Sequence, residues 1–234
     1  MVNNVYIHIP FCRNICTYCD FSKMFYNEEM ISNYLNSLEK EINKTYKNDA
    51  IETLYVGGGT PSCLNKKHLE KLFEIISTLN LKKDYEFTFE CNIEDINKEL
   101  LMFLKNNKVN RLSIGIQSFN KKILNTLGRN YNFNIIEKIL LCKKYFDNIN
   151  VDLIYGINNQ TIKDLKQDLE KFLSLDITHI SIYSLILEDN TILKINNYIP
   201  MEGDEVREMY DLIKKILKEN NYIHYEISNF SKEG

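Results

Sequence analysis

The chain has 234 residues, a mass of 27.7 kDa and a formal net charge of −3 at pH 7, with 44% hydrophobic and 26% charged residues. This length suits one large domain, and the composition is that of a globular protein, which excludes a disordered or fibrous chain. A slightly negative net charge provides no general attraction to nucleic acid or anionic lipid, so we expect no nucleic-acid partner.

No run of residues approaches the roughly 18 apolar residues that a membrane-spanning helix needs. Residues 1–4 lead directly into a strand-like segment, with no basic region and no cleavage site of a signal peptide. We therefore expect a soluble, cytoplasmic protein without a transmembrane segment. In a reducing compartment the six cysteines are better interpreted as metal ligands or buried thiols than as disulfides.

Strand-like and helix-like segments alternate along the chain. Strands are predicted at residues 5–9, 53–56, 85–91, 111–117, 151–155 and 179–187, and residues 225–230 resemble one more. Helices are predicted at residues 28–47, 66–79, 97–106, 121–127, 133–145, 162–173 and 205–220. Six successive strand–helix units predict an α/β fold with a parallel sheet and right-handed crossovers.

The periodicity of apolar residues does not decide whether this sheet is an open doubly wound sheet or a barrel. Candidate functional residues follow the first two strands, and Glu90, Gln117 and Asp152 are interpreted as lying toward the carboxyl ends of the next three. Polar residues spread over so many strand ends favour a barrel, because an open sheet binds its ligand at one switch point. We expect a partial (βα)6 TIM-like barrel in a single domain, residues 1–234. The last predicted strand has no following helix, so the chain is expected to be truncated.

Three cysteines lie within eight residues on the loop after the first strand. Cys12, Cys16 and Cys19 have the spacing C-x₃-C-x₂-C. Three thiolates can hold three irons of a [4Fe–4S] cluster and leave the fourth iron without a protein ligand. The alternative is a zinc site, which would need a fourth ligand such as Asp20 or His8. The spacing favours the cluster.

This loop, with Tyr-Ile-His-Ile-Pro-Phe before Cys12, resembles the signature of the radical S-adenosylmethionine (SAM) superfamily. Further matches follow in order at residues 57–62, 90, 113–119, 127–129, 151–156, 179–187 and 225–230. The chain is similar to the branch that contains oxygen-independent coproporphyrinogen III oxidase and the heme chaperone HemW. Cys19-Asp20-Phe21 follows the chaperone pattern, whereas the oxidase pattern is C-G-C. The resemblance implies that a C-terminal domain of the family would follow residue 234.

The resemblance implies a set of cofactor residues that surround SAM. Gly residues let the backbone approach the amino group, Glu90 suits the ribose hydroxyls or the ammonium, and Arg129 can pair with the carboxylate. Each of them could instead be an ordinary turn residue, strand-end polar group or packed side chain. No catalytic residue is assigned; His8 could transfer a proton, although a packed strand histidine is the alternative. The implied SAM contacts are Tyr6, Tyr18, Gly58, Gly59, Thr60, Glu90, Gln117, Arg129 and Asp152.

The family branch implies a heme chaperone that delivers heme to acceptor proteins and keeps a SAM-binding [4Fe–4S] site served by a one-electron donor. The alternative is a coproporphyrinogen III oxidase of porphyrin biosynthesis that uses a 5′-deoxyadenosyl radical, and a heme-modifying radical methyltransferase is a third possibility. His68, His179 and His224 are candidate axial heme ligands without a supporting pattern. The remaining cysteines, Cys63, Cys91 and Cys142, are expected to be buried small residues.

Overall fold

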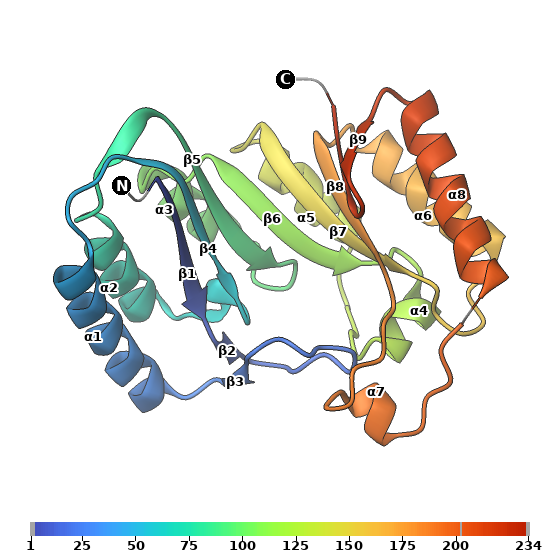
Figure 1. Ribbon diagram of the computed structural model, residues 1–234, viewed down its shortest axis with the longest axis horizontal. Helices are drawn as coiled ribbons and strands as arrows, with labels where there is room; N and C mark the ends of the chain where they lie inside the picture. Colours follow the sequence, from blue (N-terminus) through green and yellow to red (C-terminus); the bar gives the residue numbers. More distant parts are fainter. Residues whose placement is uncertain (1–2, 202, 233–234) are drawn as a thin grey trace. The chain divides into compact units, whose positions relative to one another are not determined.

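The computed structural model describes residues 3–201 and 203–232 (Figure 1). The chain divides into two compact units. The first comprises Met1–Ile15 and Phe21–Leu112, and the second comprises Cys16–Asp20 and Ser113–Gly234. Each unit is described by itself below. Among the described residues, no helix has the length and hydropathy that crossing a membrane requires.

The first unit is built on three parallel strands in the order β1-β4-β5. They are β1 (Asn4–Ile9), β4 (Ile51–Gly58) and β5 (Leu81–Asn92), and Ile9 pairs with Gly58. Helices α1 (Glu28–Thr45) and α2 (Lys66–Ile76) lie side by side (Figure 1), and α3 (Lys98–Asn106) follows β5. The short strands β2 (Phe11–Cys12) and β3 (Met24–Phe25) pair with each other, and a 3-10 turn, η1, spans Pro61–Cys63. Because the strands are parallel, their carboxyl ends share one edge.

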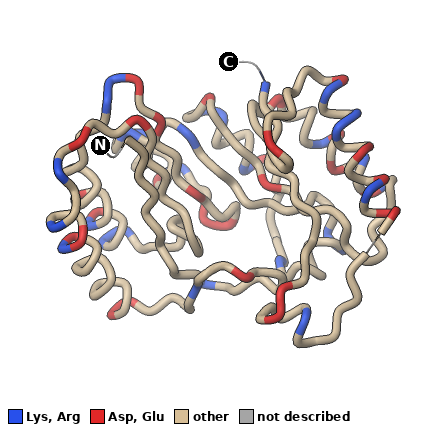
Figure 2. The backbone as a smooth tube through the Cα atoms, viewed as in Figure 1, with Lys and Arg blue, Asp and Glu red and all other residues tan. Residues whose placement is uncertain are grey.

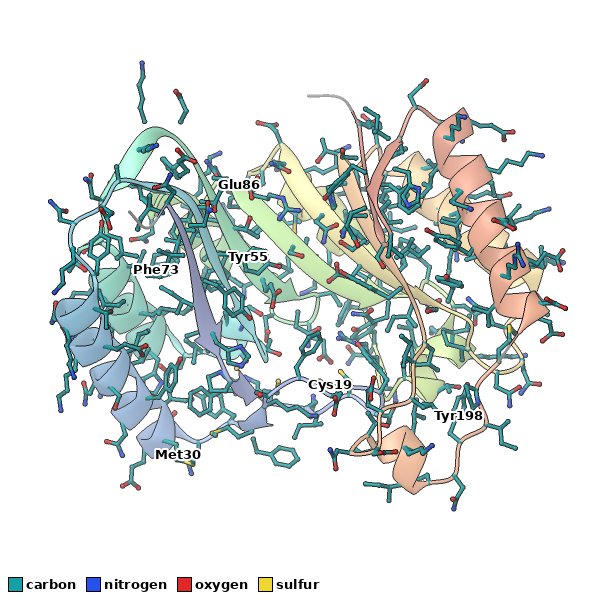
Figure 3. The ribbon with its side chains drawn as sticks, in the orientation of Figure 1. Cys19, Met30, Tyr55, Phe73, Glu86 and Tyr198 are labelled. Atoms are coloured by element: carbon teal, nitrogen blue, oxygen red, sulfur yellow. The ribbon has the colours of Figure 1, made fainter. Side chains whose placement is uncertain are left out.

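An aromatic cluster forms much of the core of this unit. Phe73, from the apolar face of α2, lies between that helix and the strands (Figure 3). Its ring centroid is 5.9 Å from that of Phe87, 5.7 Å from that of Phe89 and 5.1 Å from that of Phe103. Phe87 and Phe89 are fully buried on β5. These contacts anchor α2 and α3 to the strand that carries Glu90 at its carboxyl end.

The second unit has strands in the order β6-β7-β8-β10-β9. They are β6 (Arg111–Gln117, which begins in the first unit), β7 (Asn148–Tyr155), β8 (His179–Ser184), β10 (Asn229–Ser231) and β9 (Ile223–Glu226). β7 and β8 are parallel, whereas β10 is antiparallel to β8 and to β9. The helices are α4 (Lys121–Thr126), α5 (Ile135–Lys143), α6 (Ile162–Ser174), α7 (Ile192–Ile195) and α8 (Asp204–Glu219), with α6 beside α8. In both units, charged residues occur mainly on helices and loops, while the strands carry few (Figure 2).

All six predicted strand–helix units are present, but two strand predictions were wrong in detail. The single strand predicted at residues 225–230 is a hairpin, in which β9 and β10 flank a turn at Ile227 and Ser228. The Glu226 side chain accepts a hydrogen bond from the Ser228 amide, and this local bond supports the turn. The strand predicted at residues 179–187 ends at Ser184, because Ser184 pairs with Tyr155, the last residue of β7.

Candidate functional site

The cysteine loop contributes residues to both units. In the first unit Cys12 is buried at the end of β2, and its Sγ lies 3.3 Å from the Thr60 hydroxyl. In the second unit Cys16 and Cys19 are half-buried and form a turn in which the Cys19 amide donates to the Cys16 carbonyl (3.2 Å); Cys19 is labelled in Figure 3. No disulfide forms among the described residues, which include all six cysteines. Among the same described residues, no group of three or more His, Cys, Asp or Glu side chains is arranged to hold a metal ion.

The glycine-rich turn after β4 approaches side chains that a larger residue would displace. A Cβ atom on Gly57 would lie 2.7 Å from Glu90 Cδ, and one on Gly59 would lie 2.9 Å from Cys12 Sγ. Gly58 has a φ of +121°, which only glycine adopts readily. Its amide donates a 3.0 Å hydrogen bond to Glu90 Oε2. The turn therefore brings backbone groups against both the Cys12 thiol and the Glu90 carboxylate of the first unit.

Glu90 is held by hydrogen bonds within the first unit. Tyr55 donates its hydroxyl to Glu90 Oε1 at 2.6 Å, and the Tyr55 ring lies 5.7 Å from that of Tyr6. Tyr6 is 57% exposed, so the face of its ring is accessible beside this carboxylate. His8 Nε2 lies 2.8 Å from the Ser22 carbonyl and Nδ1 lies 3.2 Å from the Tyr6 hydroxyl. Both ring nitrogens of His8 thus have partners, which is the arrangement of a packed histidine.

Arg129 is the most heavily hydrogen-bonded of the predicted residues in the second unit. Its Nη1 donates to the Gly115 carbonyl (3.1 Å) and to the Tyr131 hydroxyl (2.7 Å), and its Nη2 donates to the Tyr18 hydroxyl (3.1 Å). Burial raises the pKa of Tyr18 despite the nearby guanidinium, so Tyr18 accepts this bond as a neutral phenol. Gly128, at a φ of +73°, leaves room for Thr17, whose amide donates to the Leu127 carbonyl.

Arg129 also lines an open cavity of about 430 Å³ in the second unit. Lys121 and Lys171 contribute two more positive charges to it, and none of the lining residues that the structure describes is acidic. A cavity with this lining favours an anionic group over a cationic one.

Gln117 and Asp152 lie near Arg129 around a single glycine. A Cβ atom on Gly115 would be 2.8 Å from Gln117 Nε2, 3.6 Å from Arg129 Nη2 and 3.9 Å from Asp152 Oδ2. Gln117 is buried and its backbone has a φ of +69°, an uncommon conformation for a residue other than glycine. The absence of a side chain at position 115 therefore lets these three predicted residues gather on one face of β6 and β7.

A buried polar network beside Asp152 was missed by the sequence interpretation. Asn150 donates to Asp152 Oδ1 (2.7 Å) and to Ser113 (2.8 Å), and its own oxygen lies 2.6 Å from His179 Nδ1. A signal was present in the sequence: polar residues alternate with apolar ones at positions 148, 150 and 152 and at 179 and 181. Such alternation usually marks a solvent-facing strand, whereas Asn150, His179 and Ser181 are buried.

Of the three candidate heme-ligating histidines, His68 and His179 are buried and His224 is exposed. Both ring nitrogens of His179 have partners, Asn150 and Tyr225. His68 is buried and pairs with Ser32, and His224 stacks on Phe230 with ring centroids 4.4 Å apart. The three cysteines outside the loop are buried as predicted, and burial raises the pKa of the Cys63 and Cys142 thiols to about 12.

Comparison with known proteins defines the class to which this fold and motif belong. The family model of the radical SAM superfamily matches residues 6–172. The chain therefore belongs to the radical SAM superfamily, and the expected α/β radical SAM fold is confirmed. The solved structure of coproporphyrinogen III oxidase (HemN) from Escherichia coli, described as a radical SAM enzyme, aligns with a TM-score of 0.89. It is 24% identical and covers 99% of this chain and 55% of its own.

Among curated proteins, the chain is similar to heme chaperones named HemW. It is 40% identical to the protein of Lactococcus lactis over 99% of this chain and 63% of that protein. It is 39% identical to the protein of Bacillus subtilis over 100% of this chain and 64% of that protein. The chain thus spans just under two thirds of the length of these relatives.

The donor chemistry of the residues fits the cofactors that the superfamily name implies. Three thiols occur within eight residues, which suits iron–sulfur ligation. The glycine turn forms a cradle that a Cβ atom would fill, beside the carboxylate of Glu90. Arg129 supplies a guanidinium, the group that pairs best with a carboxylate, and its Nη2 lies beside Gly115 near Gln117.

Proposed function

We propose that residues 1–234 form the radical SAM core of a cytoplasmic heme chaperone of the HemW type, which binds heme and delivers it to acceptor proteins. The observation that carries this proposal is the 40% and 39% identity to two heme chaperones over essentially the whole chain. Cys19-Asp20-Phe21 in place of a C-G-C pattern is consistent with it.

In this proposal Cys12, Cys16 and Cys19 hold a [4Fe–4S] cluster as thiolates. When bound, the cluster and SAM supply one-electron chemistry at the sulfonium. The chain's own residues bind and orient SAM: the turn at Gly58, Gly59 and Thr60 offers backbone groups, and Arg129 pairs with the carboxylate. The other proposed contacts are Tyr6, Tyr18, Glu90, Gln117 and Asp152.

The second candidate is an oxygen-independent coproporphyrinogen III oxidase. It is favoured by the fold similarity to the solved oxidase from Escherichia coli, with a TM-score of 0.89. That likeness, at 24% identity, concerns the fold. Chemistry depends on the site rather than on the fold, so the sequence identity to the chaperones has more weight.

Two anaerobic assays on the reconstituted protein separate these candidates. Titration with heme, followed by visible absorption, is expected to show saturable binding, and incubation with coproporphyrinogen III, SAM and a reductant is expected to yield no divinyl product. The Cys16→Ala variant is the matched control for cluster dependence in both assays. If the wild type forms the divinyl product and Cys16→Ala does not, the protein is the oxidase instead. If the wild type fails to bind heme, the chaperone proposal is wrong.

A further inference from the structure

We propose that Tyr225, His179 and Asn150 form a one-directional hydrogen-bond chain that positions the Asp152 carboxylate for the ribose hydroxyls of SAM. This inference rests on the proposed function, because it takes Asp152 as a SAM contact. The three residues act through Asp152 and are positioning residues. All four belong to the second unit, on strands β7, β8 and β9.

Asn150 is the centre of the chain. It shares a face of β7 with Asp152, two residues further on, and it pairs in register with His179 on β8. Asn150 Nδ2 lies 2.7 Å from Asp152 Oδ1, and Asn150 Oδ1 lies 2.6 Å from His179 Nδ1. Only 3% of Asn150 and 8% of His179 is exposed, so water cannot readily replace either partner.

The direction of each bond follows from which groups can donate. A carboxylate can only accept, so the amide nitrogen of Asn150 faces Asp152 and its oxygen faces His179. His179 must then donate from Nδ1, which leaves Nε2 of a neutral ring as an acceptor. The Tyr225 hydroxyl lies 2.6 Å from Nε2 and donates to it. Every proton in the chain therefore points toward Asp152.

Ser113 helps to fix this orientation from β6. Its Oγ lies 2.8 Å from Asn150 Nδ2 and accepts the second amide proton. A flipped amide would direct its oxygen at the carboxylate and its nitrogen at the His179 N–H. Two buried hydrogen bonds would then be lost, which disfavours the flipped amide.

The consequence for Asp152 is that the bond from Asn150 fixes the orientation of its carboxylate. Oδ1 accepts from Asn150, and Oδ2 lies on the side where Gly115 carries no side chain. A carboxylate is a recurrent partner of ribose hydroxyls in nucleotide-binding sites. The chain thus assigns to Tyr225, His179 and Asn150 the recognition of the ribose rather than of the adenine or the methionine part.

A matched pair of substitutions at one position tests the direction. His179→Asn keeps a donor near the Nδ1 position, whereas His179→Gln moves the amide to the Nε2 position and removes that donor. Affinities for S-adenosylhomocysteine and its 2′-deoxy analogue are measured by equilibrium dialysis. We expect the wild type and His179→Asn to prefer the ribose form equally, and His179→Gln to lose this preference about tenfold, a change equivalent to about 1.4 kcal/mol.

Tyr225→Phe tests the outer end of the chain and remains informative if the His179 variants do not fold. Its ring is 59% exposed, so the loss of one hydroxyl should leave folding intact. We expect the same loss of ribose preference, about two- to fivefold. Wild-type preference in both Tyr225→Phe and His179→Gln would overturn the proposal.

Two further measurements separate this inference from the proposed function. Nitrogen-15 NMR of histidine-labelled protein should show the Nδ1–H tautomer at His179; the Nε2–H tautomer would reverse the chain and overturn it. Absence of S-adenosylhomocysteine binding by the wild type would contradict the SAM site itself. Normal binding with a wild-type preference in His179→Gln would contradict only the hydrogen-bond chain.

Discussion

In each unit, a glycine determines how closely polar side chains approach one another. Gly57 lies against the Glu90 carboxylate, and Gly115 lies against Gln117 and near Asp152. The sequence predicted the turn at residue 57 because consecutive glycines interrupt a strand. It did not predict the role of residue 115, because a strand glycine signals a close approach without naming the partner.

Replacing Glu90 by Gln tests the carboxylate of the first unit. We expect SAM affinity to fall about ten- to one-hundredfold, because a hydrogen bond to a charged group contributes about 1.5–3 kcal/mol to the binding free energy. Equilibrium dialysis with SAM provides the measurement. Glu86→Gln is the matched control, because Glu86 is exposed and lies four residues before Glu90 on the same face of β5; this variant should bind as the wild type does. Equal affinity in both variants would contradict the assignment of Glu90.

Arg129→Lys tests the guanidinium of the second unit. A lysine ammonium cannot reproduce the planar fork that reaches the Gly115 carbonyl and the hydroxyls of Tyr18 and Tyr131. We expect a loss of about 1–3 kcal/mol in the free energy of unfolding and about tenfold weaker SAM binding. Urea denaturation and dialysis measure the two effects. Arg207→Lys, at an exposed site on α8, should change neither; a wild-type-like Arg129→Lys protein would show that the fork is dispensable.

Among the elements, α6 has the most complete start signal. The Thr161 hydroxyl accepts from the Asp164 amide, and the Asp164 carboxylate accepts from the Thr161 amide, which forms a capping box. Asp164 also accepts from Asn120, the N-cap residue of α4. One carboxylate thus supports the starts of two helices.

The capping box predicts a pH-dependent stability. Hydrogen bonding from Thr161 is the main cause that lowers the pKa of Asp164 below its ordinary value of 3.8. This stabilisation is therefore present above the ordinary value and is lost as pH falls through the lowered pKa. Asp164→Asn should cost about 0.5–1 kcal/mol in denaturation at neutral pH, and the difference from the wild type should vanish in acid.

Asp204→Asn is the control for that prediction, because Asp204 lies in the first turn of α8, whose N-cap, Gly203, has no side-chain cap. A pH-independent difference between Asp164→Asn and the wild type would rule out the capping carboxylate as its source.

Element positions were more predictable than their pairing. The repeated apolar spacing located the helices to within a few residues, since each helix buries one face. The hairpin of β9 and β10 was not predicted because Ile227-Ser228 lacks the glycine or asparagine of common two-residue turns. The Asn150–His179 contact was also not predicted, because it depends on the register between β7 and β8. The sequence of one strand does not determine its register with another.

At the scale of the whole molecule, the residues that the sequence singled out fall into two sets. Tyr6, Glu90 and the glycine turn belong to the first unit, and Tyr18, Gln117, Arg129 and Asp152 belong to the second. The three loop cysteines were predicted as cluster ligands from their close spacing in sequence. The proposed chaperone function was not derivable from spacing, because one fold serves many activities.

The most direct test of the account is EPR spectroscopy of the anaerobically reconstituted, reduced protein with and without SAM, together with iron and sulfide analysis. In the proposed site, Cys12, Cys16 and Cys19 leave one iron of a [4Fe–4S] cluster without a protein ligand, so we expect a cluster whose spectrum changes when SAM is added. The Cys16→Ala variant should contain little iron and give no such signal. A wild-type protein that carries zinc instead, or a cluster spectrum that SAM leaves unaltered, would contradict the account.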